Sequence, residues 1–94
     1  MKAIWQGHVI AQSNQTIVLG GYHYFPRTTV DFRFLIDSEE RGEHRVAGPL
    51  HYFHLQLPDG TRIPNAAWEA RRASGEMAIL AEHIAFEGCV EVKG

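Results

Sequence analysis

Apolar and polar residues alternate along several short stretches of this chain, and this pattern predicts β-strands. The segment 50–57 is the clearest case, and one of its two faces would carry His51, Phe53, Leu55 and Leu57. The segment 28–36 alternates in the same way, and its core face would carry Val30, Phe32, Phe34 and Ile36. A period of two places alternate side chains on one face of a strand. Both segments are therefore predicted to be half-buried strands.

Turn-forming residues separate these and other short strands. Gln6-Gly7 predicts a tight hairpin in which Trp5 faces His8. Pro58-Asp59-Gly60-Thr61 predicts a second hairpin turn, because proline presets one turn torsion and glycine tolerates positive φ. A further short strand is expected over 16–19, a charged loop over 37–42, and an edge or bend over the aromatic stretch 22–26, which ends in a proline.

The C-terminal third contains the only helical pattern. Apolar residues recur there at helical spacing, at Met77, Leu80, Ala81 and Ile84, which predicts a short helix over 75–82. The segment 66–70 suits either a strand or a helix. With seven or eight short strands, the chain is expected to form one all-β domain over residues 1–94. We expect a small, curled antiparallel sheet or barrel-like structure with one short C-terminal helix.

Size and charge narrow the function classes. A chain of 94 residues has room for one core, and its 45% hydrophobic content argues against wholesale disorder. Nine basic against eleven acidic residues give a net charge of −2, so a nucleic-acid partner is not expected, and Arg71-Arg72 would be a solvated pair. No apolar run approaches the ~18 residues of a membrane helix. Because Cys89 is the only cysteine, no intrachain disulfide can form, and a cytoplasmic location is expected.

The six histidines are the residues of this sequence best suited to bind a metal or transfer protons, but their spacing does not predict a metal site. His51 and His54 would lie on opposite faces of one strand, and no pair has the i, i+2 spacing of strand ligands. A metal would need ligands from separate segments, such as His23, His44 and His51. We therefore expect neither a metal nor another cofactor.

A cluster of aromatic residues with polar tips suggests a binding cleft. Its walls and donors would be Tyr24, His51 and Trp68, with Arg33 as an anchor for an anion. The same aromatic side chains would also serve simply to fill a small core. The first hypothesis is thus a non-catalytic module for a small polar or aromatic ligand. The second is a small enzyme in which His44 or His51 acts as general base beside Tyr24. The third is a self-association module that forms a homodimer through exposed sheet edges.

Four segments, taken in order and spacing, resemble the bacterial domain of unknown function 427 family. They are Met1–Ser13, Gly21–Pro26, Gly48–Phe53, and Ala67-Trp68 with the stretch 83–92. The resemblance implies a single, mostly antiparallel β domain and no established activity. Some family labels suggest a nucleotidyltransferase, but Asp37-Ser38-Glu39 in a charged loop does not supply the carboxylate pair that such an enzyme needs for Mg²⁺.

The chain departs from that family's pattern at one place. Many members carry Cys-Pro-Trp-Lys before the glycine at position 48, where this sequence has His44-Arg45-Val46-Ala47. If those side chains serve a family function, that function is altered or lost here.

Overall fold

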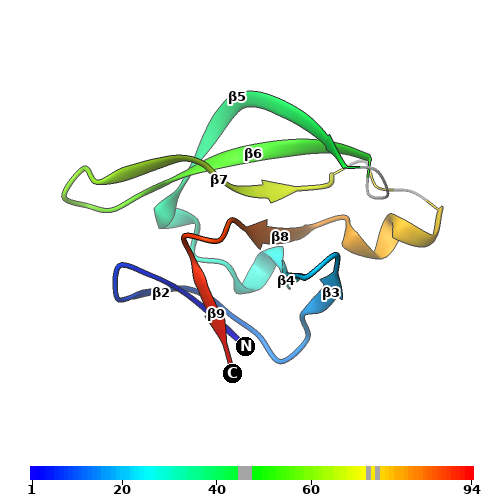
Figure 1. Cartoon of the computed structure of the whole chain (residues 1–94), viewed down its shortest axis with the longest axis horizontal. Helices are drawn as coiled ribbons and strands as arrows, with labels where there is room; N and C mark the ends of the chain where they lie inside the picture. The colour runs from blue at the N-terminus through cyan, green and yellow to red at the C-terminus, as the bar shows by residue number, and fades with distance from the viewer. Residues whose placement is uncertain (45–47, 72, 74) are drawn as a thin grey trace.

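The computed structural model describes residues 1–44, 48–71, 73 and 75–94, and in them the chain is built from strands (Figure 1). This confirms the predicted all-β class. The strands are β1 (Lys2–Trp5), β2 (His8–Gln12), β3 (Ile17–Leu19), β4 (Tyr22–Pro26), β5 (Leu35–His44), β6 (Gly48–Gln56), β7 (Arg62–Glu69), β8 (His83–Phe86) and β9 (Glu91–Lys93). Three short 3₁₀ helices accompany them: η1 (Arg27–Thr29), η2 (Phe32–Phe34) and η3 (Gly75–Leu80).

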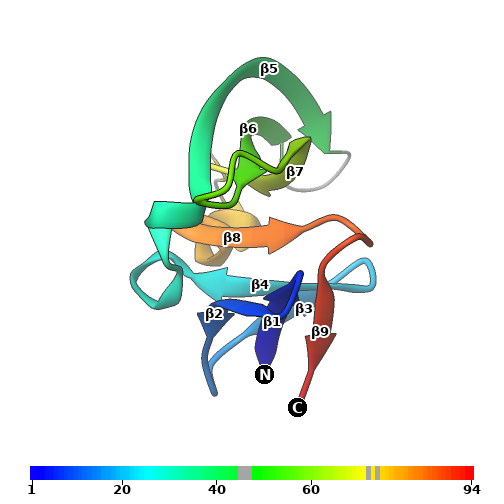
Figure 2. The same cartoon turned by 90° about the vertical axis from the view of Figure 1, so that its left-hand side faces the viewer.

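The strands form two antiparallel sheets. The smaller sheet has the order β2-β1-β9, and the larger one has the order β3-β4-β8-β7-β6-β5. Figure 2 shows β5 arching over β6 and β7, while the small sheet packs below β4 and β8. The large sheet is curled but open, with β3 and β5 at its two edges, so the structure is not a closed barrel.

Both predicted hairpins are confirmed. In the first, Trp5 pairs with His8, and Gln6 and Gly7 between them both adopt positive φ, at 51° and 78°. Two such residues make the turn type whose twist matches that of the flanking strands. In the second, β6 and β7 pair on either side of the 58–61 turn. The undecided segment 66–70 lies almost wholly in β7.

The strand predicted over 28–36 is wrong in most of its length, because η1 and η2 occupy it and β5 begins only at Leu35. The carboxylate of Asp31 accepts a hydrogen bond from the backbone N–H of Arg33, which stabilises a turn in place of an extended strand. The loop predicted over 37–42 is also wrong, since these residues belong to β5. Charged side chains are common on edge strands, because they discourage pairing with a further chain, so the charges here are compatible with a strand.

Two further predictions need correction near the ends of the large sheet. The C-terminal helix is a 3₁₀ helix of six residues, and Ile84 belongs to β8. Glycine at position 75, with φ at 61°, begins this helix, and Glu82, with φ at 62°, follows it. The aromatic stretch 22–26 is not an edge, because β4 pairs with both β3 and β8. Its proline is the last residue of the strand, where a missing N–H interrupts the ladder least.

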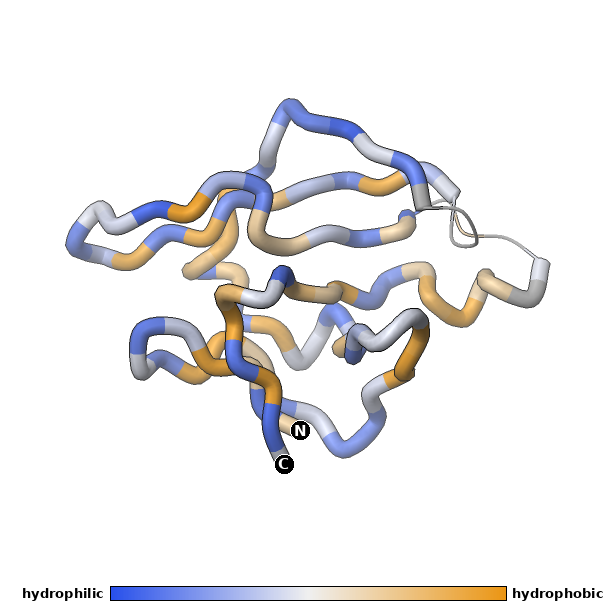
Figure 3. The backbone as a smooth tube through the Cα atoms, viewed as in Figure 1, coloured by the Kyte–Doolittle hydropathy of each residue, from blue (hydrophilic) through white to orange (hydrophobic). Residues whose placement is uncertain are grey.

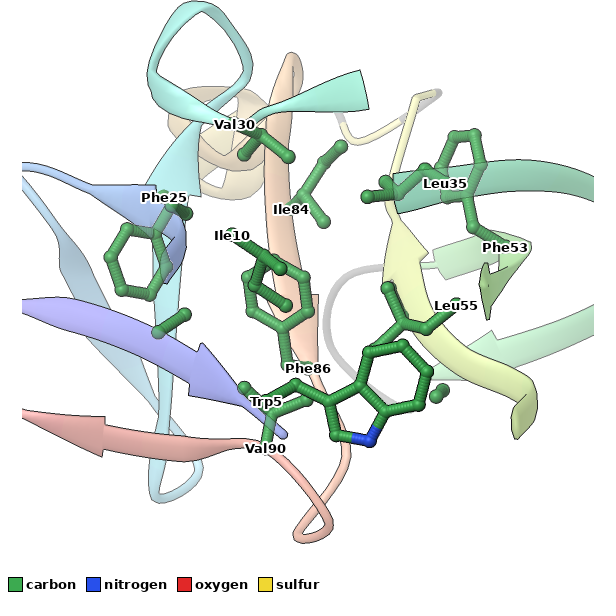
Figure 4. Close-up of a cluster of buried hydrophobic side chains, with 14 of the residues drawn as sticks. Trp5, Ile10, Phe25, Val30, Leu35, Phe53, Leu55, Ile84, Phe86 and Val90 are labelled. Atoms are coloured by element: carbon green, nitrogen blue, oxygen red, sulfur yellow. The ribbon is translucent and has the colours of Figure 1, made fainter. Parts of the chain in front are cut away.

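Two groups of buried side chains hold the structure together. The main core joins the two sheets and includes Trp5, Ile10, Phe25, Phe53, Leu55, Ile84 and Phe86 (Figure 4). A second group, which we call the Tyr24 cluster, comprises Tyr24, Leu50, Trp68, Ala70, Leu80 and Ala85. Buried neighbours alternate between these two groups in β4 and β8, and in β7 the change falls between Ala67, in the main core, and Trp68, in the Tyr24 cluster. Figure 3 shows the contrast with β5, which is mostly hydrophilic.

Candidate functional site

A buried carboxylate lies at the centre of the candidate site. Glu69 is the last residue of β7 and is only 1% exposed. Its Oε1 atom accepts hydrogen bonds from Arg71 Nε at 2.6 Å and from Arg27 Nη1 at 3.0 Å. Its Oε2 atom lies 3.2 Å from the same Arg27 nitrogen. Burying a carboxylate is costly unless charged donors surround it, and here two guanidinium groups do so.

Aromatic rings fix the two arginines from a second direction. The Cζ atom of Arg27 lies 4.5 Å from the ring centre of Phe32, and that of Arg71 lies 5.6 Å from the ring centre of Phe53. The two phenylalanine rings contact each other edge to face, with their centres 6.0 Å apart. Guanidinium groups bind favourably to aromatic faces. Both arginines therefore have a defined orientation before any ligand arrives.

His51 continues this network toward the edge strand. Its Nδ1 atom lies 3.2 Å from Arg71 Nη1, and its Nε2 atom lies 3.1 Å from Asp37 Oδ1. A guanidinium nitrogen only donates, so Nδ1 must accept and the imidazole proton must be on Nε2, where it is donated to Asp37. His51 is thus a neutral imidazole in this arrangement, with both nitrogens engaged.

The network borders a cavity of about 390 Å³. Its lining residues are Arg41, Pro49, Leu50, His51 and Arg71. Arg41 is held in place because its Nη1 donates to the backbone carbonyls of Ser38 and Glu40, at 2.7 and 2.8 Å. Two cations, one neutral imidazole and two apolar side chains therefore surround a volume that suits a small organic molecule.

A second cavity of about 340 Å³ adjoins the first. It is lined by Arg27, Glu69, Arg71 and Glu82, so Arg71 borders both cavities. A third hollow, lined by Asp37, Ser38, Glu39, Glu40 and His54, is acidic. Within the described part of the chain, no group of three histidine, cysteine or acidic side chains is arranged to hold a metal ion.

The sequence singled out four residues as ligand contacts, and the structure brings two of them, Tyr24 and Trp68, into direct contact. Tyr24 is fully buried, and its hydroxyl accepts a hydrogen bond of 3.3 Å from Trp68 Nε1. Both rings belong to the same buried cluster as Leu50, which in turn lines the first cavity. His51 lines that cavity directly. Arg33 lies apart from it on η2, where it is 86% exposed and paired with Asp31 at 2.6 Å.

Two other residues were candidates for reactive groups, Cys89 and His44. Desolvation raises the pKa of the Cys89 thiol above that of an ordinary cysteine, which keeps it protonated at neutral pH. The side chain of His44, together with residues 45–47 and Arg72, lies outside the described residues, so its proposed role as a base stays a prediction.

Sequence reasoning missed Arg27, Arg41 and Glu69, and it considered Arg71 only as a surface residue. One signal was available for Glu69. It follows Ala66, Ala67 and Trp68 and precedes Ala70, and an acidic residue inside an apolar run needs charged partners if the run is buried. The sequence contains no comparable signal for Arg27, whose pairing with Glu69 depends on the topology of the sheet.

Comparisons with known proteins agree with the β architecture and add no activity. The family model described as Domain of unknown function (DUF427) matches residues 1–93. A comparison with curated proteins finds no match. Among the described residues, no helix has the length and apolar character needed to cross a membrane.

Proposed function

The chain belongs to the family described as Domain of unknown function (DUF427), and from its site we propose that it binds a small organic anion. The ligand would occupy the cavity lined by Arg41, Leu50, His51 and Arg71. The observation that carries this proposal is the fixed orientation of Arg71, which donates to both Glu69 and His51 and lies over Phe53.

The chemistry of the cavity supports an anion. Guanidinium groups present planar sets of donors that match carboxylate and phosphate oxygens. Arg41 and Arg71 both line the cavity, and no acidic residue is among its lining residues. Pro49 and Leu50 would contact the apolar part of the ligand. Because the arginines are already held in place, little conformational entropy is lost when the ligand binds.

Binding is favoured over catalysis by the hydrogen bonds of His51. A general base needs a free lone pair directed at the proton that it removes. The Nδ1 lone pair of His51 instead accepts from Arg71, and its Nε2 proton is donated to Asp37. Tyr24 and Trp68 would support the cavity from behind through Leu50, and the role of anion anchor, first assigned to Arg33, would belong to Arg41 and Arg71.

Calorimetric titration with acetate, butyrate, benzoate and inorganic phosphate at low salt tests the proposal. We expect at least one of these anions to bind, and Arg41→Gln to weaken that binding by about tenfold, the effect of losing one charged hydrogen bond. Arg33→Gln is the matched control, since it removes the same charge from an exposed site and should bind like the wild type. The proposal is wrong if no anion binds, or if both variants weaken binding equally.

A further inference from the structure

We infer that the ligand is a zwitterion, with its anionic group in the first cavity and an ammonium group in the second cavity, beside Glu82. This inference rests on the proposed function and adds the chemical class of the ligand. It starts from the shared wall between the cavities, because Arg71 lines both. A molecule that extends past Arg71 would therefore contact both sets of lining residues.

The two cavities differ in charge. The first has two arginines and no acidic residue among its lining residues. The second has two arginines and two acidic residues, Glu69 and Glu82, so its charges balance. From the first cavity to the second, the lining therefore changes from net positive to balanced, and the Glu82 carboxylate is on the balanced side. A ligand with separated positive and negative groups matches this polarity, whereas a dianion would place one negative group beside Glu82.

The two acidic residues of the second cavity are not equivalent. Glu69 is buried and accepts three hydrogen bonds from the two guanidinium groups, so its charge is already compensated. Glu82 is exposed, and among the described residues no ion pair involves it. Of the two, Glu82 is the one whose carboxylate is available to a ligand, and an ammonium group is its natural partner.

The backbone holds Glu82 at this position. Its φ of 62° lies in the left-handed region, which is uncommon for residues other than glycine and persists where neighbouring structure imposes it. Its carbonyl oxygen accepts a hydrogen bond of 2.7 Å from the backbone N–H of Arg27. Glu82 is therefore fixed beside the arginine that lines the same cavity.

Matched ligand pairs provide the test, measured by calorimetric titration at neutral pH and low salt. The pairs are 3-aminopropionate with propionate, 4-aminobutyrate with butyrate, and 6-aminohexanoate with hexanoate, which differ within each pair only by the ammonium group. We expect at least one amino acid to bind about threefold to fivefold more tightly than its partner, the gain of a solvent-exposed ion pair. Glu82→Gln should reduce this ratio to about one. Glu87→Gln, an exposed residue with the same charge change, should keep the wild-type ratio.

The outcomes separate the two proposals. If the carboxylates bind and no amino acid binds more tightly than its partner, the zwitterion is wrong and anion binding stands. If Glu87→Gln reduces the ratio as much as Glu82→Gln, the effect comes from net charge and the assignment to Glu82 is wrong. If neither member of any pair binds to the wild-type protein, the zwitterion is wrong, and anion binding is also wrong if acetate, benzoate and phosphate fail to bind.

Discussion

The Oε1 atom of Glu69 lies 2.6 Å from the Nε atom of Arg71, and this buried contact orients the arginine that borders both cavities. The same oxygen also accepts from Arg27, which stands 42 residues earlier in the chain. One carboxylate thus connects η1, which directly follows β4, to the end of β7. It contributes to the stability of the fold and to the geometry of the site at the same time.

Replacing Glu69 with glutamine should destabilise the protein, because two guanidinium groups would lose their shared negative partner. Breaking a buried ion pair costs several kcal/mol. The arginines here are 39% and 42% exposed, so we expect water to reduce the loss to about 2 kcal/mol in the free energy of unfolding. Urea denaturation measures this difference.

The control for that experiment is Glu91→Gln. Glu91 is 63% exposed and pairs with Lys93 at 3.5 Å, so its loss should change the stability by less than about 1 kcal/mol. Equal stability of Glu69→Gln and the wild type would contradict a structural role for the buried carboxylate.

Tyr24→Phe should remove the acceptor for the indole N–H of Trp68. Both side chains are buried, so that N–H would remain without a partner. We expect a loss of about 1 kcal/mol in the free energy of unfolding, the usual cost of an unsatisfied buried donor. Tyr22→Phe, at a residue that is 37% exposed, should change the stability little. If both variants unfold at the same urea concentration as the wild type, the Tyr24 hydroxyl has no such role.

Gly42→Ala should strain the pairing of β5 with β6. A Cβ atom at this position would lie 2.7 Å from Cε2 and 2.8 Å from Oη of Tyr52, closer than real contacts allow. We expect a loss of about 1–2 kcal/mol, as in other overpacked sites. The same change in a Tyr52→Ala background should cost less, which a double-mutant cycle measures. Gly88→Ala is the control, because nothing lies within 4 Å of its added Cβ.

The turn at Asp59 should make stability depend on pH. A hydrogen bond from the backbone N–H of Thr61, 2.8 Å long, lowers the pKa of the Asp59 carboxyl in the folded protein. A folded pKa below the unfolded value stabilises the protein at pH values above about 4. That stabilisation is lost as the pH falls through the folded pKa.

Comparison with Asp59→Ala tests this sign. The wild type should be more stable than the variant at pH 6, and the difference in unfolding free energy should shrink at pH 2.5. A difference that stays constant or grows on acidification would contradict the role of the ionised carboxylate.

The sequence predicts the fold best where one face of a strand is buried and the other is more exposed to solvent. In β6, Phe53 and Leu55 are buried as their alternation indicates. The alternation of apolar and polar residues fails as a guide in β5, because the charged residues of this edge strand suggest a loop. It also fails around Asp31, where the alternation suggests a strand but the Asp31 side chain stabilises a turn. It is also ambiguous in β7, because its last four residues are all buried, so no period of two is visible there.

The candidate site is less accessible to such reasoning. His51 lines the cavity because its strand pattern places it next to Phe53 on one face. Arg27 and Glu69, by contrast, meet only because β8 pairs with both β4 and β7, an arrangement that no local pattern encodes. Tyr24 and Trp68 look like ligand contacts in the sequence because aromatic residues with polar tips suit both a pocket and a small core.

The burial of β7 and β8 on both faces has a consequence for motion. Ala67 and Phe86 belong to the main core, whereas their neighbours Trp68 and Ala85 belong to the Tyr24 cluster. Neither strand can leave without disrupting both groups, so their amides should exchange hydrogen with solvent only through near-global unfolding. Glu69 is the last residue of β7 and so belongs to the part of the molecule that we expect to exchange most slowly. A ligand would therefore meet a preformed site, and its association rate should rise linearly with its concentration in a single kinetic phase.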